Sequence, residues 1–347
     1  MSCRRNVLSD RVTSMRKGAP RASGKEVLRA AIIGCGFIAG LYDAPKRDRA
    51  VRSHAKAYWL EPATRLVAVT DLVPGRARDF AARWQVPGVY DSVRALMETE
   101  SPDIVSICTP DETHLDVLQE CLESRGLRAV WCEKPLGTVV ARAERLVEAC
   151  QQRGIVLAVN YQRRWDHLVG QLKQALQEGK LGDLQKVVVY YGRGVLHNGS
   201  HAVDLLLDWL GAPEKVQVEG RIFDFTPGDP TVDAFVLMGG IPVHLIGIDS
   251  RHYSLFEMDL FGTKGRVTLA NFGRRLEWFP RESASGPDQA GELQERPTIQ
   301  RRGGPTAMRL ALDEIVRAVR TGGRVRSNGE TALVTLRVCS ELAGAMG

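Results

Sequence analysis

A glycine-rich motif is the first stretch of this chain whose residue types could do chemistry. Gly34-Cys35-Gly36-Phe37-Ile38-Ala39 fits G-x-G-x-x-A, directly after the apolar run at residues 27–33. In this pattern the first glycine permits a tight turn, the second lets backbone approach a pyrophosphate, and the small last residue allows close helix packing. We therefore predict that Gly34, Gly36, Phe37 and Ile38 bind a dinucleotide; a glycine turn without a ligand is the alternative.

A second apolar run, at residues 65–70, ends at Asp71. A carboxylate at the tip of the second strand accepts hydrogen bonds from ribose hydroxyls and repels a 2′-phosphate, which favours NAD over NADP. Asp71 lies 37 positions after Gly34, whereas the usual spacing is about 20, so we interpret residues 41–63 as an insertion. Arg76 and Arg78 are near enough in sequence to accept a 2′-phosphate, and NADP stays open.

Two further motifs follow apolar runs and carry polar side chains. They are Thr109-Pro110-Asp111-Glu112-Thr113-His114 and Glu133-Lys134-Pro135. Because an open parallel sheet binds its ligand beyond the carboxyl ends of its strands, we expect contacts to the cofactor from these motifs: Thr109, Pro110, His114, Glu133 and Lys134. In a partly dry crevice beside a nicotinamide, the charged form of an ammonium is disfavoured. Lys134 could then act as an acid or base near neutral pH; a surface lysine before a turn is the alternative.

The stretch at residues 194–211 has apolar residues at helical spacing, and His201 opens that helix. A helix N-terminus disfavours imidazolium, so a neutral His201 could take a proton from a substrate hydroxyl. A capping or core histidine is the simpler alternative. His197, His201 and Asp204 also have a spacing that could hold a metal, but further ligands at comparable spacing are missing, and we expect no metal.

These motifs need a scaffold that brings them together. Near-continuous apolar runs separated by amphipathic segments predict an α/β fold, with an N-terminal Rossmann domain built on a doubly wound parallel sheet. Strand-like runs between residues 184 and 280 alternate with short turns, which predicts a C-terminal α+β domain with a large, mostly antiparallel open sheet. We expect a flexible basic tail at residues 1–25, an NAD(P)-binding domain at 26–145, and a substrate-binding and oligomerisation domain at 146–347. The last helices are candidates to pack back on the first domain.

The four motifs, in this order, resemble the family of glucose–fructose oxidoreductase, inositol dehydrogenase and MocA proteins (Gfo/Idh/MocA), over residues 27 to about 346. The resemblance implies that Lys134 lies at the nicotinamide and takes part in substrate binding and proton transfer. The family commonly has D-x-G-x-H-x-x-D where this chain keeps Gly199, His201 and Asp204 but has His197 in place of the aspartate. Lys134, His201 and His197 are therefore the candidate catalytic residues.

The segment Asn160-Tyr161-Gln162-Arg163-Arg164-Trp165 resembles an arginine–aromatic segment of the same family. Arg164 could clamp an anionic or polyhydroxyl group of the substrate, or it could form an ion pair between domains. With Asn198 and His201, it completes the candidate substrate-binding residues.

Together these observations predict an NAD(P)-dependent oxidoreductase that moves a hydride between nicotinamide and a secondary alcohol or ketone of a sugar, inositol or related derivative. Two alternatives stay open: a dinucleotide-binding regulator without turnover, and a glycosidase that oxidises its substrate transiently with NAD. The resemblance also implies a homodimer or homotetramer.

Charge and composition exclude other classes. Seven basic residues and one acidic residue within residues 1–25 account for the whole net charge of +6, so the rest of the chain is neutral overall. A nucleic-acid partner would need a basic face, and we expect no such partner. The alternative to a flexible tail at residues 1–25 is an organelle transit peptide. No apolar run approaches the roughly 20 residues of a membrane span. Seven cysteines without a C-x-x-C pair indicate reduced thiols and a cytoplasmic protein.

Overall fold

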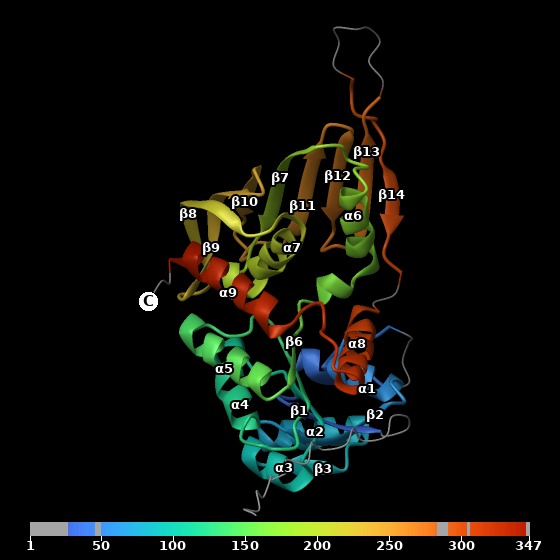
Figure 1. Ribbon diagram of the computed structural model, residues 1–347, viewed down its shortest axis with the longest axis vertical. Helices are drawn as coiled ribbons and strands as arrows, with labels where there is room; N and C mark the ends of the chain where they lie inside the picture. Colours follow the sequence, from blue (N-terminus) through green and yellow to red (C-terminus); the bar gives the residue numbers. More distant parts are fainter. Residues whose placement is uncertain (1–26, 46–49, 283–290, 304–305, 345–347) are drawn as a thin grey trace, which may run out of the picture.

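The computed structural model describes residues 27–45, 50–282, 291–303 and 306–344. The predicted basic tail lies outside these residues. Two sheets lie one beyond the other along the long axis of the molecule, and helices from the C-terminal part of the chain lie where they meet (Figure 1). The α/β class and the pair of a parallel and a mostly antiparallel sheet are confirmed.

The first sheet has six parallel strands in the order β3-β2-β1-β4-β5-β6. The order reverses direction between β1 and β4, which opens a ligand crevice at the carboxyl ends of the central strands. The strands are β1 (Leu28–Ile33), β2 (Thr64–Thr70), β3 (Gly88–Tyr90), β4 (Ile104–Ile107), β5 (Ala129–Cys132) and β6 (Val156–Val159).

Both faces of this sheet are covered, as near-continuous apolar strands require. Alternate residues point to opposite faces: Ala31 and Ile33 join one hydrophobic core, whereas Ala30 and Ile32 join the other. The first face carries α3 (Val93–Glu100), α4 (His114–Cys121) and α5 (Val140–Gln152). The second carries α1 (His54–Leu60), α2 (Pro74–Trp84) and α8 (Ala307–Thr321), the last from near the C-terminus of the chain.

The parallel sheet extends beyond residue 145, where the sequence placed the domain boundary. β6 pairs in register with β5, and Ala158 also bridges to Asn328. A four-residue apolar run does not reveal from sequence which of two sheets it joins, and this explains the difference. We propose that the division between the domains follows β6, near residue 160. α9 (Gly329–Ala343) then spans the division, because it packs on α5 and on α7 (Ser200–Leu210).

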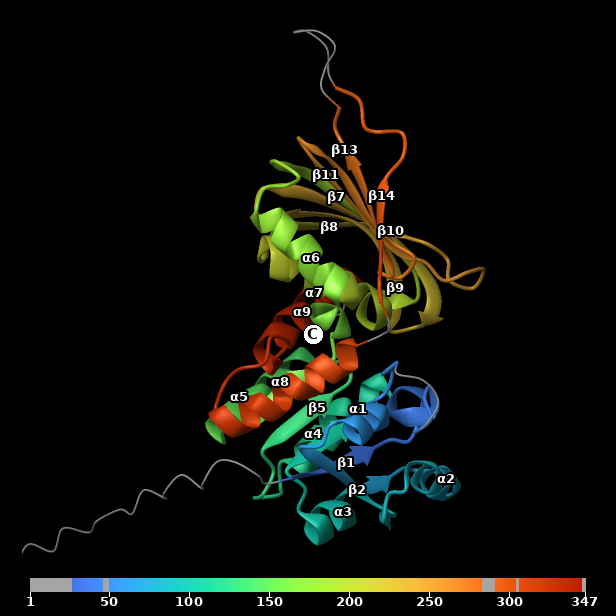
Figure 2. The ribbon, with the colours of Figure 1, turned by 90° about the vertical axis from the view of Figure 1, so that its right-hand side faces the viewer.

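The second sheet has eight strands in the order β14-β13-β12-β11-β7-β10-β9-β8. Only the central pair β7 and β10 is parallel; the other neighbours are antiparallel. α6 (His167–Gln177) and α7 lie on one face, and Figure 2 shows the strands curving away from them. The strands are β7 (Leu184–Tyr191), β8 (Pro213–Thr226), β9 (Asp229–Met238), β10 (Ile241–Gly247), β11 (Phe256–Gly262), β12 (Gly265–Ala270), β13 (Arg275–Pro280) and β14 (Thr298–Arg301).

The predicted insertion at residues 41–63 contributes α1 and the loop before it. The glycine motif leads into a single π turn, η1 (Phe37–Leu41), and the regular helix on the sheet begins only at His54. Asp43 is buried and accepts hydrogen bonds from the backbone N–H of Arg52 and the hydroxyl of Ser53, each at 2.8 Å. These bonds tie the two ends of the loop together and fix where α1 starts.

Candidate active site

The glycine turn at the end of β1 is shaped for a close approach of backbone. Gly34 has φ +86°, and a Cβ there would lie 2.7 Å from the carbonyl oxygen of Cys108 and 2.9 Å from the nitrogen of Thr109. Only glycine fits this contact between the ends of β1 and β4. At Gly36, by contrast, a Cβ would meet nothing within 4 Å. This open cradle at the start of η1, where the first N–H groups have no partner inside the turn, fits a dinucleotide pyrophosphate.

Asp71 lies at the tip of β2, as predicted, and it faces the glycine turn. Its Oδ2 accepts the N–H of Cys35 and its Oδ1 accepts the N–H of Val73, each at 2.8 Å. Arg76 is half exposed and lies 3.5 Å from the same carboxylate. Asp71 therefore orders the turn after β2 and holds it against the glycine motif.

His114 joins two turns and does not reach the crevice. It is fully buried; its Nδ1 lies 2.7 Å from the carbonyl oxygen of Pro135, and its Nε2 lies 2.9 Å from that of Thr109. We predicted a contact with the cofactor, but both ring nitrogens are occupied by these carbonyls. His114 holds the Thr109-Pro110 turn against the Lys134-Pro135 turn, whose peptide bond is cis, and so positions both.

Glu133 also points away from the crevice, into a buried polar network beneath Lys134. Its Oε1 accepts hydrogen bonds from Nε2 of His54 at 2.8 Å and Nδ2 of Asn160 at 2.6 Å. Burial opposes its ionisation, but these bonds and the charge of Lys134 outweigh burial and lower the pKa of Glu133. The other ring nitrogen of His54 lies 2.9 Å from the hydroxyl of Ser106, so the insertion helix α1 supports the floor of the site.

Lys134 makes a hydrogen bond between the two domains, at the end of β5. Its Nζ donates to the carbonyl oxygen of His197 at 2.5 Å, and His197 lies in the π turn η4 (Gly194–Gly199) that follows β7. Burial lowers the pKa of Lys134, although the carboxylates of Asp111, Glu133 and Asp229 oppose that shift. The ammonium is therefore easier to deprotonate than an exposed lysine.

His197 forms an acid–base pair with a residue that the sequence did not single out. Its Nδ1 lies 2.7 Å from Oδ2 of Asp111, in the turn after β4, and its ring stacks on Phe225 at a centroid distance of 4.5 Å. Burial opposes ionisation of Asp111, but the hydrogen bond from His197 and the charge of Lys134 outweigh burial and lower its pKa. When Nδ1 donates to this carboxylate, Nε2 of His197 is left as an acceptor.

His201 opens α7, as the spacing predicted, and it is buried between two aromatic rings. Tyr161 and Phe256 meet it edge-on, at centroid distances of 5.9 and 6.4 Å. Among the described residues, its Nδ1 has no hydrogen-bond partner. Burial, and then the positive charges of Arg163 and Lys134, hold the pKa of His201 well below 6.5. The imidazole is therefore neutral and able to accept a proton.

Arg164 is held in an ion pair, the alternative weighed for it from the sequence. Its Nε and Nη2 donate to the two oxygens of buried Asp204 at 2.7 and 2.9 Å, and Nη1 donates to Asp208 at 3.1 Å. Burial nevertheless raises the pKa of Asp204 to about 6. The guanidinium is thus unavailable as a substrate clamp, and both partners lie on α7 rather than on the first domain.

The neighbouring Arg163 points elsewhere and was missed from the sequence, where two adjacent arginines in a short turn look alike. With Phe272 it lines a cavity of about 170 Å³. A smaller cavity of about 80 Å³ is lined by His197, Asn198 and Arg193, and again by Phe272. Asn198 donates from Nδ2 to the carbonyl oxygen of Gly192 at 2.9 Å and forms part of this wall.

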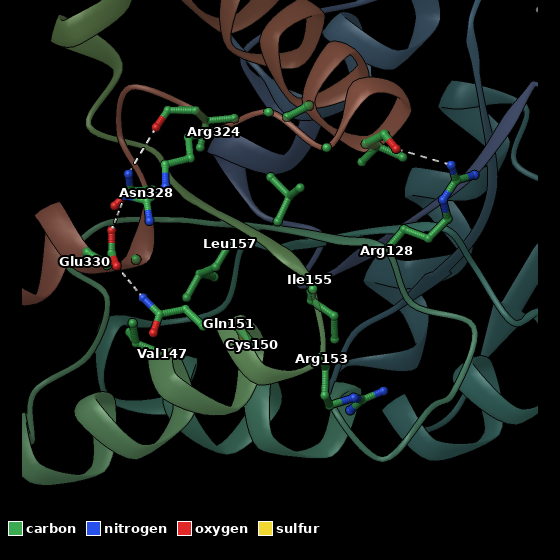
Figure 3. Close-up of a pocket in the computed structure, with 18 of the residues that line it drawn as sticks. Arg128, Val147, Cys150, Gln151, Arg153, Ile155, Leu157, Arg324, Asn328 and Glu330 are labelled. Carbon is green, nitrogen blue, oxygen red and sulfur yellow. Dashed lines mark hydrogen bonds and ion pairs between the residues drawn. The ribbon is translucent and has the colours of Figure 1, made fainter. Parts of the chain in front are cut away.

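A larger cavity, about 480 Å³, lies at the opposite end of the parallel sheet (Figure 3). It is bordered by the last turn of α5, the start of β6 and the loop between α8 and α9. Its polar side chains pair with one another: Glu330 accepts from Gln151 at 2.5 Å and from Arg324 at 3.0 Å. Because it lies at the amino ends of the strands, away from the glycine turn, we do not place the active site there.

Within the described ranges, no group of three or more His, Cys, Asp or Glu side chains is arranged to hold a metal ion. No helix in that part of the chain is both long enough and apolar enough to cross a membrane.

The glycine cradle, the acidic tip of β2 and the titratable groups beyond β4 and β5 point to the class that the family confirms: a dinucleotide-dependent oxidoreductase on a Rossmann fold. The chain belongs to the Gfo/Idh/MocA oxidoreductase family with an NAD-binding Rossmann fold, whose family model matches residues 28–161. It is an NAD(P)-dependent enzyme of the dehydrogenase type that acts on CH–OH groups.

A curated relative supports this assignment, and two solved structures support the fold. The chain is 30% identical to D-glucoside 3-dehydrogenase of Escherichia coli strain K12 over 282 residues, which cover 70% of this chain and 77% of the relative. A 3-ketoreductase from Actinomadura kijaniata, solved with TDP-benzene and NADP, has a TM-score of 0.73 at 20% identity, covering 92% of this chain and 97% of that chain. An oxidoreductase from Agrobacterium radiobacter, solved with NAD+, L-tartaric acid and magnesium, has a TM-score of 0.69 at 19% identity, covering 92% and 96%. At these identities the two structures support the fold alone.

Proposed function

We propose that this enzyme interconverts a secondary alcohol and a ketone on a sugar, an inositol or a related derivative, with Lys134, His201 and His197 as its catalytic residues. One observation carries the proposal: Lys134 of the first domain donates directly to the backbone of His197 in the second, at 2.5 Å, which joins the end of β5 to the turn before His201. The name of the D-glucoside relative supports a sugar carbinol as the substrate.

Each residue has a role that follows from its environment. A neutral His201, with a buried ring nitrogen that has no protein partner in the described residues, is suited to take the hydroxyl proton of the alcohol. Lys134, whose pKa is lowered by burial, is suited to bind the same oxygen and to exchange its proton. Asp111 orients the ring of His197 and fixes which nitrogen carries the proton.

The cofactor fits the glycine cradle. Gly36, Phe37 and Ile38 would hold its pyrophosphate, Asp71 its adenosine ribose, and the Thr109-Pro110 turn its nicotinamide half; when bound, the nicotinamide supplies or accepts the hydride. Asp71 favours NAD. Arg76, half exposed and next to Asp71, is the group through which NADP would bind.

The test is a titration followed by turnover. Quenching of tryptophan fluorescence by NADH and NADPH measures the two affinities, and absorbance at 340 nm then follows a panel of sugars, inositols and sugar phosphates. We expect tighter binding of NADH, and a loss of at least a hundredfold in kcat for Lys134→Ala with nucleotide affinity retained. Lys215→Ala, on β8 away from the crevice, is the matched control.

Other outcomes would overturn the proposal. Nucleotide binding without turnover of any substrate would favour a regulator, and cleavage of a glycoside without net change in NADH would favour a redox-neutral glycosidase. Failure to bind either nucleotide would contradict the cofactor assignment itself.

We also propose a homo-oligomer, formed through the face of the eight-stranded sheet opposite α6 and α7. That face carries partly exposed apolar side chains, among them Val188, Phe235 and Ile246, which alternate with buried core residues along β7, β9 and β10. Exposed apolar side chains gathered on one face are characteristic of subunit contacts. Light scattering of the purified chain gives the mass; a monomer at micromolar concentration would contradict this expectation.

A further inference from the structure

Three arginines gather beside the candidate active site. Arg163, Arg274 and Arg302 line the cavity of about 170 Å³, together with Gln162, Asp166 and Phe272. The ring of Phe272 also borders the smaller cavity that contains His197 and Asn198. The arginine-lined cavity is therefore next to the site at which the substrate carbinol would bind.

The positive charge of this cavity is not balanced by protein groups that line it. Asp166 is the one carboxylate among the lining residues, and both of its oxygens are used: Oδ1 accepts the N–H of Leu168 at 2.9 Å, and Oδ2 accepts from Arg302 at 2.6 Å. Among the described residues, neither Arg163 nor Arg274 has an ion-pair partner. With three guanidinium groups and one carboxylate, the lining carries a net charge of about +2 at neutral pH.

Arg163 is only partly satisfied by protein groups. Its Nη1 donates to the carbonyl oxygen of Phe272 at 2.7 Å, its guanidinium lies 3.8 Å above the ring of Phe256, and its Nε is buried without a partner in the described residues. Burial lowers the pKa of Arg163 to about 10. A buried cation with an unsatisfied donor is costly unless an anion completes it.

The backbone is arranged to hold these charges together. The N–H of Arg302 donates to the carbonyl oxygen of Arg274 at 2.9 Å, which places the two arginines opposite each other at the end of the β13–β14 ladder. Like charges opposite one another destabilise a sheet. Phe272 also has φ +58°, a conformation that is strained for a bulky residue and is found mainly at functional sites.

Gly273 completes the arrangement. A Cβ at this position would lie 2.9 Å from Nη1 of Arg163, so glycine lets the turn between β12 and β13 approach the guanidinium. Unpaired charge and opposed arginines lower stability. A ligand with negative charge would offset both.

We propose that this cavity binds an oxyanion carried by the substrate, either a phosphate or a carboxylate, so that the enzyme acts on an anionic sugar derivative. The proposal rests on the function proposed above. Arg163 and His201 meet the same ring, that of Phe256, at 3.8 and 6.4 Å, which places the oxyanion and the reacting carbon within one small molecule. The three arginines supply the charge-assisted, bidentate donors that such groups prefer.

The first experiment measures binding and does not depend on turnover. Inorganic phosphate and D-gluconate are titrated calorimetrically into the enzyme saturated with NADH, which blocks the pyrophosphate site. The variant is Arg274→Gln, which removes one exposed guanidinium of the cavity. The control is Arg301→Gln, the same charge change on β14 at an exposed position outside the cavity.

We expect at least one of the two anions to bind wild type and Arg301→Gln alike, and to bind Arg274→Gln about tenfold or more weakly. Binding of phosphate alone identifies a phosphoryl substrate, and binding of gluconate alone identifies a carboxylate. The inference is overturned if neither anion binds, or if both variants bind as wild type does.

A second experiment separates this inference from the proposed function. Turnover at 340 nm is compared for neutral sugars and for their phosphates or acids. Arg274→Gln should raise KM for the anionic substrates about tenfold or more, whereas Arg301→Gln should leave KM unchanged for both kinds of substrate. Anion binding without turnover of any sugar would support the oxyanion site and contradict the proposed dehydrogenase activity. Turnover of neutral sugars without anion binding would support the dehydrogenase activity and contradict the oxyanion site.

Discussion

Replacing Asp111 with asparagine tests whether the histidine that occupies the family's aspartate position is catalytic. The amide keeps the size of the side chain but removes the charge that faces Nδ1 of His197 at 2.7 Å. A hydrogen bond to a charged group contributes about 1.5–3 kcal/mol, which corresponds to a loss of roughly ten- to 150-fold in kcat/KM. Both partners are about a quarter exposed, which favours the lower end of that range.

The assay is steady-state turnover at 340 nm across pH, with Glu112→Gln as the control. Glu112 is the next residue in the same turn and is exposed, so its variant has the same change in net charge. We expect Asp111→Asn to lower kcat/KM and to change its pH profile, with thermal stability and NADH affinity close to those of the control. If the two variants stay within about twofold of each other, His197 does not act through Asp111 and the reasoning fails.

Three further predictions follow from the same contacts. Gly34→Ala should lose NADH binding and about 2–5 kcal/mol of stability, because its Cβ would lie 2.7 Å from a carbonyl oxygen at φ +86°; fluorescence titration and thermal unfolding measure both. Arg164→Met should lose about 3–5 kcal/mol in urea unfolding, because it leaves Asp204 buried and unpaired, whereas Lys173→Met, at a half-exposed pair, should lose less than about 1 kcal/mol. The pKa of His201 lies well below 6.5 in the fold, so the unfolded chain binds a proton that the folded chain does not. The free energy of unfolding should therefore fall by up to about 1.4 kcal/mol per pH unit as pH drops below 6.5. His201→Gln should remove this pH dependence between pH 7 and 5.

The scaffold could be predicted because its signals are local. The apolar runs and the glycine motif lie within short stretches, and the runs at residues 27–33 and 65–70 are observed as β1 and β2. The placement of β6 could not be predicted, since a short apolar run fits either sheet and only pairing with β5 decides it.

The candidate site was predicted less completely, because its decisive contacts join distant residues. Asp111 and His197 are 86 positions apart, and His54 and Glu133 are 79 apart. The motifs also did not reveal where two side chains point. His114 and Glu133 follow β4 and β5, where cofactor contacts were predicted, yet both side chains point into the protein and bind polar partners there. A role was predicted for Arg164 and none for Arg163, yet the short 3-10 turn Gln162–Trp165 sends Arg164 to Asp204 and Arg163 to the carbonyl oxygen of Phe272.

The path of α8 has a consequence for how this enzyme is made. The helix comes from near the C-terminus, yet it completes one face of the sheet that carries the glycine turn, and Figure 2 shows it lying across that sheet. The dinucleotide site is therefore finished only after almost the whole chain has left the ribosome, because a hydrophobic face stays uncovered until then. We therefore expect that the N-terminal half cannot be excised or exchanged as a module. A truncation before residue 307 should lose nucleotide binding although every candidate nucleotide-binding residue is still present.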